Sequence, residues 1–437
     1  MLCRIRRLLY YHEASMIFVM IAIFIAGYTL IALEHTLKVN KAASALAAGI
    51  LAWTVYVLWQ PDKHEVILSL KEHFEGIAEI LFFLLGAMTI VELIDAHGGF
   101  EVITSRIRTR NKRTLLWIIA SITFFLSAVL DNLTTAIVMV SLVQKILSDR
   151  NDRLTFAGMI VIAANAGGAW SPIGDVTTTM LWIGGNITTL PTIQHNILPS
   201  IACLLVPLIA ASFFVRGRIA ANDAGVVSRE KNVVFFLGLG VLLFTPVFKT
   251  VTHLPPFIGI LFGLSVLWIA TEIMHRGKDN ESRKKFSVAN ALQRIDSASV
   301  LFFLGILLCV AALEANGSLA ELSKFLSAAI GNDVIIISVI GLLSAVVDNV
   351  PLVAAVMGMY PLSLHGTDSF FWQFLTYCAG TGGSILIIGS AAGVAAMSIE
   401  KIDFFWYLKR IGALAFIGYI AGIAVFLIQM TLMHGQM

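Results

Sequence analysis

Two short polar segments interrupt apolar stretches of this chain, and the second repeats the first. Residues 127–132 read Ser-Ala-Val-Leu-Asp-Asn, and residues 344–349 read Ser-Ala-Val-Val-Asp-Asn. An ionised aspartate in the interior of a membrane costs several kcal/mol, so such residues are rare there and usually functional. If the surrounding stretches cross a bilayer, the two Asp-Asn pairs therefore indicate sites that bind a ligand.

A second polar interruption follows each Asp-Asn pair. Residues 165–179 read Asn-Ala-Gly-Gly-Ala-Trp-Ser-Pro-Ile-Gly-Asp-Val-Thr-Thr-Thr, and residues 380–390 read Gly-Thr-Gly-Gly-Ser-Ile-Leu-Ile-Ile-Gly-Ser. Helices broken at such positions leave backbone groups unpaired, which is tolerated at membrane depth only where they line a cavity or bind something. Carboxylate, amide and hydroxyl oxygens without His or Cys suit alkali or alkaline-earth cations rather than zinc or copper.

The predicted cation- and proton-binding residues share oxygen-bearing side chains at these four interruptions. They are Asp131, Asn132, Thr134, Thr135, Asn165, Ser171, Asp175, Thr177, Thr178, Ser344, Asp348, Asn349 and Ser384. Within this set, we expect Na+ to bind at Asp131, Asn132, Asp175, Asp348 and Asn349.

Cation/proton exchange is the chemistry that these carboxylates favour. A buried carboxylate holds either a proton or a cation, and rarely both, which is the minimal machinery of antiport. Neutral Ser390 stands in the second copy where Asp175 stands in the first, so we expect the proton chemistry to depend on the first copy. The alternative is that Asp131 and Asp348 only cap helices in a packed core.

The composition indicates a membrane protein. Of 437 residues, 58% are apolar and 13% are charged, which is more apolar surface than a soluble chain could bury. Apolar runs near the spanning length of about 20 residues recur throughout. The predicted spans are 15–33, 42–60, 77–97, 114–130 with 133–147, 155–183, 197–215, 233–250, 255–274, 298–315, 333–347 with 349–360, 370–399 and 408–432.

The two halves of the chain are predicted to be copies with opposite orientations. Matching residues lie 219 positions apart at Gly86, 217 apart at Asp131 and 215 apart at Gly167, a slow drift that short loop deletions produce. An odd number of crossings separates equivalent points, as in the inverted repeats of many secondary transporters. The positive-inside rule then places the loops rich in Lys and Arg in the cytoplasm, namely 98–113, 216–231 and 275–294.

We therefore expect an all-α polytopic membrane protein with inverted-topology repeats of about five spans each. Each repeat would contain a re-entrant helical hairpin at its Asp-Asn pair, where the segments are short, and a discontinuous helix at its glycine-rich break. The alternative is that each hairpin is two ordinary spans with Asp-Asn in solvent. The expected parts are an N-terminal segment 1–14, a first repeat 15–215, a cytoplasmic linker 216–232 and a second repeat 233–432.

Residues 1–14 do not fit this topology. Arg4, Arg6 and Arg7 fall on the side that should carry few positive charges. Either they are an exception to the rule or translation starts at Met16. The apolar run that follows is too long for a signal-peptide core and precedes no small-x-small cleavage site, so we expect a retained span.

No zinc site is predicted. The four cysteines lie far apart, and no His-Glu-x-x-His motif occurs. Most histidines fall in predicted loops or at the ends of spans. His97 is interpreted as an ordinary interfacial residue, with a role as a pH sensor as the alternative.

The polar motifs resemble those of the NhaD-type sodium/proton antiporters, which belong to an ion-transporter superfamily with arsenite pumps and sodium-coupled dicarboxylate carriers. The motifs are residues 131–136, 165–178 and 348–351, and the resemblance covers about residues 16 to 430. It implies export of Na+ and Li+ against entering protons by a homodimer in a bacterial inner membrane, with an elevator-like movement. It assigns binding roles to Asp131, Asn132, Asn165, Asp175, Thr177, Thr178, Ser344, Asp348, Asn349 and Ser384.

Rival functions fit the motifs less well. Superfamily members that import dicarboxylate or sulfate with Na+ carry Ser-Asn-Thr turns, whereas the Asp here repels an anion; arsenite transport is a further alternative. An intramembrane aspartyl protease needs Gly-x-Gly-Asp, but Pro172 precedes Ile173, Gly174 and Asp175. A primary pump would need a phosphate loop, which is missing from the sequence. A passive channel remains an alternative function, although the inverted repeat favours alternating access.

We predict a lipid-embedded secondary transporter, not an enzyme, with no cofactor beyond the transported ions and no nucleic-acid partner.

Overall fold

The protein is described by a computed structural model that covers residues 2–32, 34–105, 107, 109–219, 228–279, 284 and 286–434. Three parts of the topology prediction lie outside the described residues: Arg106 with Arg108, residues 220–227 of the expected linker, and residues 280–283 with 285 of the loop 275–294. Every named element among the described residues is a helix. The chain divides into two compact units.

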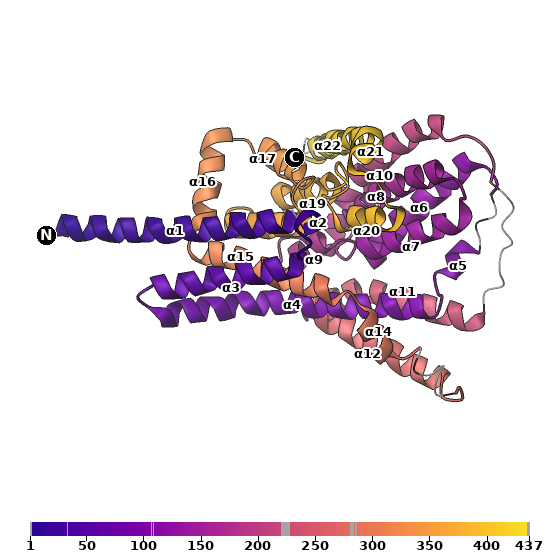
Figure 1. Cartoon of the computed structure of the whole chain (residues 1–437), viewed down its shortest axis with the longest axis horizontal. Helices are drawn as coiled ribbons and strands as arrows, with labels where there is room; N and C mark the ends of the chain where they lie inside the picture. Colours follow the sequence, from indigo (N-terminus) through magenta and orange to yellow (C-terminus); the bar gives the residue numbers. More distant parts are fainter. Residues whose placement is uncertain are drawn as a thin grey trace. The chain divides into compact units, whose positions relative to one another are not determined.

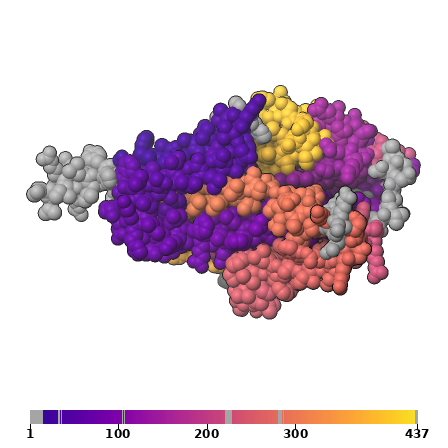
Figure 2. Space-filling model, turned by 60° about the horizontal axis from the view of Figure 1, so that its bottom comes forward, coloured from indigo at the N-terminus to yellow at the C-terminus, as the bar shows by residue number. Residues whose placement is uncertain are grey.

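The first unit combines residues Met1–Phe82, Asp296–Asn332 and Val353–Leu364. Its elements are α1 (Leu2–Ala32), α2 (Glu34–Leu37), α3 (Lys41–Trp59), the first part of α4 (Lys63–Ala96), α15 (Ser297–Ala315), α16 (Ser318–Ile330) and the last part of α18 (Asn349–Met359). Figure 2 shows α15 in orange beside the indigo and violet residues of the N-terminal helices, and α15 packs along α3. This packing needs glycine, because a Cβ on Gly305 would lie 2.3 Å from the backbone nitrogen of Leu46.

The second unit combines residues Phe83–Ile295, Asp333–Leu352 and His365–Met437. Besides the ends of α4 and α18 that fall within it, its elements are α5 (Glu101–Thr104), α6 (Lys112–Leu130), α7 (Asn132–Ile146), α8 (Arg150–Gly168), α9 (Val176–Ile183), α10 (Thr189–Phe214), α11 (Arg229–Thr252), α12 (Pro256–Met274), α14 (Val288–Arg294), α17 (Asp333–Leu343), α19 (Phe370–Gly382), α20 (Ala391–Glu400), α21 (Phe404–Tyr407), η1 (Leu408–Gly412) and α22 (Ala413–His434).

The lengths of these helices confirm the predicted fold class. Among the described residues, eight helical segments are long and apolar enough to cross a bilayer: α3, α4, α6, α10, α11, α12, α15 and Phe404–Met433. α6 begins two residues before the predicted segment and reaches 19 residues, so it passes this test alone, whereas α7 and α18 are shorter. Re-entrant and spanning hairpins therefore both remain predictions. The sequence pattern assigned no span to residues 316–332, where the structure has α16.

Both predicted discontinuous helices are broken at the glycine-rich motifs. α8 ends at Gly168 and α9 starts at Val176, while α19 ends at Gly382 and α20 starts at Ala391. Figure 1 shows α6, α7 and α8 side by side, and each of these helices contacts the other two.

Matching residues of the two copies make matching contacts. A Cβ on Gly167 would lie 2.2 Å from the carbonyl oxygen of Phe124, and a Cβ on Gly382 would lie 1.9 Å from that of Gly341. Gly167 and Phe124 in the first copy thus correspond to Gly382 and Gly341 in the second. These pairs mark where α8 contacts α6 and where α19 contacts α17. The compact units, in contrast, each contain segments of both halves, so they describe packing and leave the repeat boundaries and the orientation of the copies as predictions.

Candidate functional site

Asp175 lies where the chain enters a helix again after the break between α8 and α9. Its Oδ1 accepts hydrogen bonds from the backbone nitrogen of Thr177 at 2.9 Å and from Thr177 Oγ1 at 3.0 Å. The Thr178 hydroxyl accepts a bond from the backbone nitrogen of Asp175 at 3.2 Å, which completes a capping box. The cap thus engages Oδ1 of the carboxylate and leaves Oδ2 free for other contacts.

The asparagines of both Asp-Asn pairs meet at Oδ2 of Asp175. Asn132 Nδ2 donates to this oxygen at 2.6 Å, and Asn349 Nδ2 donates to it at 3.2 Å. All three side chains are buried, with Asp175 only 1% exposed. One carboxylate oxygen therefore joins the two copies of the repeated motif.

Asn165 extends this network to the second helix break. Its Oδ1 accepts a bond from Asn132 Nδ2 at 3.1 Å, and its Nδ2 donates to Ser384 Oγ at 2.9 Å and to Ser390 Oγ at 2.8 Å. Ser390 in turn caps α20, since its hydroxyl accepts a bond from the backbone nitrogen of Gly393. We refer below to Asn132, Asn165, Asp175, Asn349, Ser384 and Ser390 as the Asp175 network.

Four helix N-termini meet at the Asp175 network. α7 starts at Asn132, α9 follows Asp175, α18 starts at Asn349 and α20 follows Ser390. The amino end of a helix carries a partial positive charge that stabilises an anion and repels a cation. A cation can therefore bind here only if carboxylates supply compensating negative charge.

Asp131 and Asp348 make the local contacts expected if these residues cap helices, which is the alternative to a cation-binding role. Asp131 Oδ1 accepts a bond from the backbone nitrogen of Thr134 at 2.7 Å and Oδ2 accepts one from Thr134 Oγ1 at 2.8 Å. Asp348 Oδ1 accepts a bond from the backbone nitrogen of Val350 at 3.3 Å. Asp131 also has a φ of 92°, a strained conformation of the kind that concentrates at functional sites.

The structure thus separates the predicted site residues into two groups. Asn132, Asn165, Asp175, Asn349 and Ser384 belong to the Asp175 network, with Thr177 bonded to Asp175. The other predicted residues make no hydrogen bond to the carboxylate of Asp175 among the described contacts. Asp131 bonds to Thr134, Asp348 to the backbone of Val350, and Thr178 to the backbone of Asp175. Ser171 bonds to the backbone of Ile173, Ser344 to the carbonyl oxygen of Ala379, and the buried hydroxyl of Thr135 has no hydrogen-bond partner among the described residues.

Ser390 belongs to the network but was not among the predicted site residues. The repeat alignment held the signal for it, because Ser390 occupies the position of Asp175 in the second copy. From the sequence alone, that match is interpreted as the loss of a carboxylate from the second copy. The Ser390 hydroxyl nevertheless makes the same two kinds of contact as the Asp175 carboxylate. It accepts a hydrogen bond from a backbone nitrogen at the start of a helix and another from the side-chain amide of Asn165.

Sequence comparisons with known proteins indicate the family of the chain. A family profile described as "Citrate transporter" matches residues 28–377. Sodium/proton antiporter 1 of Arabidopsis thaliana is 51% identical over 93% of this chain and 72% of its own length. Sodium/proton antiporter 2 of the same plant is 47% identical over 93% of this chain and 98% of its own, and the Na(+)/H(+) antiporter NhaD of Vibrio cholerae is 35% identical over 93% and 90%.

The chain belongs to the NhaD-type sodium/proton antiporter family. The predicted family membership is therefore confirmed. Members of the NhaD-type family are named as transporters and not as enzymes, and the helices of this member make it a multi-pass membrane protein.

Proposed function

We propose that this protein exchanges Na+ for H+ at the Asp175 network. The observation that carries the proposal is the sharing of Asp175 Oδ2 by Asn132 and Asn349, one from each copy of the motif. An ionised carboxylate in a dry interior requires donors or a cation around it. Here, four hydrogen bonds from Asn132, Asn349 and the backbone and hydroxyl of Thr177 supply donors.

The same groups can hold Na+ after two side chains rotate. A half-turn about the terminal torsion of an asparagine, which is soft, replaces its Nδ2 by its Oδ1. Asn132 and Asn349 then present carbonyl oxygens beside Asp175 Oδ2, and hard oxygen ligands suit an alkali cation. When the ion leaves, a proton on Asp175 Oδ2 donates to one of these oxygens. Cation and proton therefore compete for a single atom.

Asp131 and Asp348 supply the remaining negative charge in this proposal. Each lies directly before an asparagine of the network, at a helix N-terminus whose partial charge opposes a cation. Like Asp175, Asp131 binds cation and proton alternately, and Asp348 completes or couples the site. The hydroxyls of Thr134, Thr135, Ser171, Thr177, Thr178, Ser344 and Ser384 serve as further ligands or position the carboxylates.

The names of the relatives support the transported ions. The Arabidopsis and Vibrio proteins are named as sodium/proton antiporters, and we extend this exchange to the present chain. We also propose that Li+ substitutes for Na+, that no cofactor is required and that the protein is a homodimer. We place the protein in a bacterial inner membrane, a location that the bacterial relatives support, although the plant relatives are more similar in sequence. Fractionation of the source cells tests this location.

Asp131→Asn tests the assignment of charge to the site. Asparagine also caps helices and also tolerates a positive φ, so the turn should be retained while the charge is lost. In everted vesicles that carry a respiratory pH gradient, added Na+ should collapse the gradient with the wild-type protein and leave it largely intact with Asp131→Asn. Fluorescence of a pH-sensitive dye measures the response. An unchanged response in the variant would contradict the role of Asp131.

The same vesicles distinguish exchange from anion transport. The matching family profile is described as "Citrate transporter", so radiolabelled citrate is the appropriate rival substrate. We expect no Na+-dependent citrate uptake. A wild-type protein that ignores Na+ and Li+ in the dye assay but accumulates citrate would replace this proposal with the rival function.

A further inference from the structure

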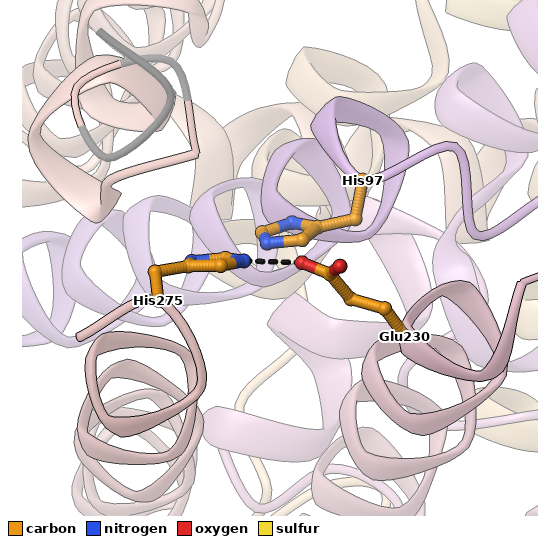
Figure 3. Close-up of side chains that lie close together, drawn as sticks. All are labelled: His97, Glu230 and His275. Carbon is orange, nitrogen blue, oxygen red and sulfur yellow. Dashed lines mark hydrogen bonds and ion pairs between the residues drawn. The ribbon is translucent and has the colours of Figure 1, made fainter. Parts of the chain in front are cut away.

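A cluster of two histidines and a glutamate lies at the ends of three helices of the second unit (Figure 3). His97 directly follows α4, Glu230 is the second residue of α11, and His275 directly follows α12. One nitrogen of each histidine and one oxygen of Glu230 all lie within 4.8 Å of one another. The cluster shares no residue with the Asp175 network.

His97 has a buried nitrogen that requires a partner. Its Nδ1 donates to the carbonyl oxygen of Leu93 at 2.7 Å, which leaves Nε2 as the acceptor of a neutral ring. The side chain is 5% exposed, and Nε2 has no hydrogen-bond partner among the described residues. The ring of His97 is therefore enclosed by protein. A buried acceptor without a partner points to a missing ligand.

The other two groups converge on the same space. His275 is 3% exposed, and its Nε2 contacts Glu230 Oε1 (Figure 3). The two imidazoles stack with ring centroids 5.1 Å apart, and Phe286 packs against both rings. Phe286 therefore covers one side of the histidine pair.

We propose that His97, Glu230 and His275 bind a divalent transition-metal ion of the zinc class. Two imidazoles and one carboxylate form a ligand set that zinc accepts, with a fourth position open to water. The bond from His97 Nδ1 to a carbonyl oxygen is the second contact that metal-bound histidines almost always make. Sodium does not fit, because two of the three donors are nitrogens.

Lys278 competes with a metal for Glu230. Its ammonium lies 2.5 Å from Oε1 and 2.8 Å from Oε2 of that carboxylate. The lysine side chain is one-third exposed and belongs to the turn after α12, so it can move into solvent, whereas the histidines cannot. Ion pairs of Glu230 with His275 and Lys278, without a metal, would give no hydrogen-bond partner to the buried Nε2 of His97.

The experiment uses the full-length protein in detergent, stripped of metal with a chelator. Competition with a chromophoric zinc chelator should give one Zn2+ per chain. Loss of a group that only supports a metal ligand typically lowers metal affinity about 10–100-fold, so His97→Gln and His275→Gln, which remove a ligand itself, should lower it at least about tenfold. His253→Gln is the matched control, because His253 is exposed and lies outside the cluster, and it should keep the wild-type affinity. Equal affinities in all four proteins would overturn the proposal.

Two further measurements do not depend on the histidine variants folding. Electron paramagnetic resonance of Cu2+ bound to the wild-type protein should show hyperfine coupling to two imidazole nitrogens, and a spectrum with oxygen ligands alone would overturn the proposal. Lys278→Met removes the competing ammonium and should tighten Zn2+ binding several-fold. An affinity that does not rise would contradict the assignment of Glu230 as a ligand.

Discussion

Asp175→Asn is expected to abolish sodium/proton exchange and to lower the stability of the protein. The substitution removes the only carboxylate in the described part of the chain that accepts hydrogen bonds from the asparagines of both copies. The amide nitrogen of the new asparagine must also face either Thr177 or the pair Asn132 and Asn349. These groups all donate hydrogen bonds to Asp175 in the wild type, so donors would then face one another. Leaving buried donors unpaired costs about 1–3 kcal/mol. The dye assay in everted vesicles measures the exchange, and thermal unfolding in detergent measures the stability.

Asp149→Asn provides the matched control for this variant. Asp149 also caps a helix, since its carboxylate accepts a bond from the backbone nitrogen of Asp152 at 3.0 Å, but it lies at the opposite end of α8 from the network. Asparagine caps helices as well as aspartate does. We expect normal exchange and a melting temperature close to that of the wild type. Exchange at the wild-type rate in Asp175→Asn would remove Asp175 from the mechanism.

Gly382→Ala is expected to be among the most destabilising single substitutions in the protein. A Cβ at this position would lie 1.9 Å from the carbonyl oxygen of Gly341, and that atom belongs to a helix backbone that has no rotamer to change. α19 and α17 must therefore move apart. Overpacking typically costs about 1–3 kcal/mol and occasionally more, and here we expect the upper end of that range.

The separation of these helices should also impair transport. Ser344, directly after α17, donates a hydrogen bond to the carbonyl oxygen of Ala379 in α19, and the turn after α17 leads into α18 at Asn349. Gly382→Ala should therefore lower the melting temperature in detergent and reduce Na+-dependent exchange together. The prediction fails if both values match those of the wild type.

Gly240→Ala is the control for the loss of a helical glycine. Gly240 is exposed on α11, and a Cβ there would meet nothing within 4 Å. Alanine is favoured over glycine in helices by up to about 1 kcal/mol, so this variant should be as stable as the wild type or slightly more stable. The pair therefore separates the effect of close helix packing from the effect of adding a methyl group.

Local features of the fold could be predicted from the sequence because their causes are local. Glycine pairs and Ser171-Pro172 disfavour a continuous helix through their own backbone chemistry, and the structure has both breaks. The long apolar runs identified most of the spans for the same reason, since span length depends on bilayer thickness. α16 was not predicted, because a helix of 13 residues is too short for that criterion.

Long-range contacts of the site could be predicted only in part. The repeat indicated that Asn132 and Asn349 are equivalent, but not that they bond to one oxygen of Asp175. The sequence also grouped Asp131, Asp175 and Asp348 as expected Na+ ligands, whereas Asp131 and Asp348 make only local capping contacts among the described hydrogen bonds. The metal-ligand cluster lacked any spacing signal, because His97, Glu230 and His275 come from distant parts of the chain.

By itself, the sequence determined which groups are available: oxygen-bearing side chains at four interruptions of apolar helices, present in two unequal copies. Only the tertiary structure decided which of these groups meet. Hydrogen bonds act over about 3 Å, so their partners depend on how closely the helix pairs α6 with α8 and α17 with α19 approach. Those approaches are set by Gly167 and Gly382, where no side chain separates the backbones. They bring the two copies of the motif to a single carboxylate.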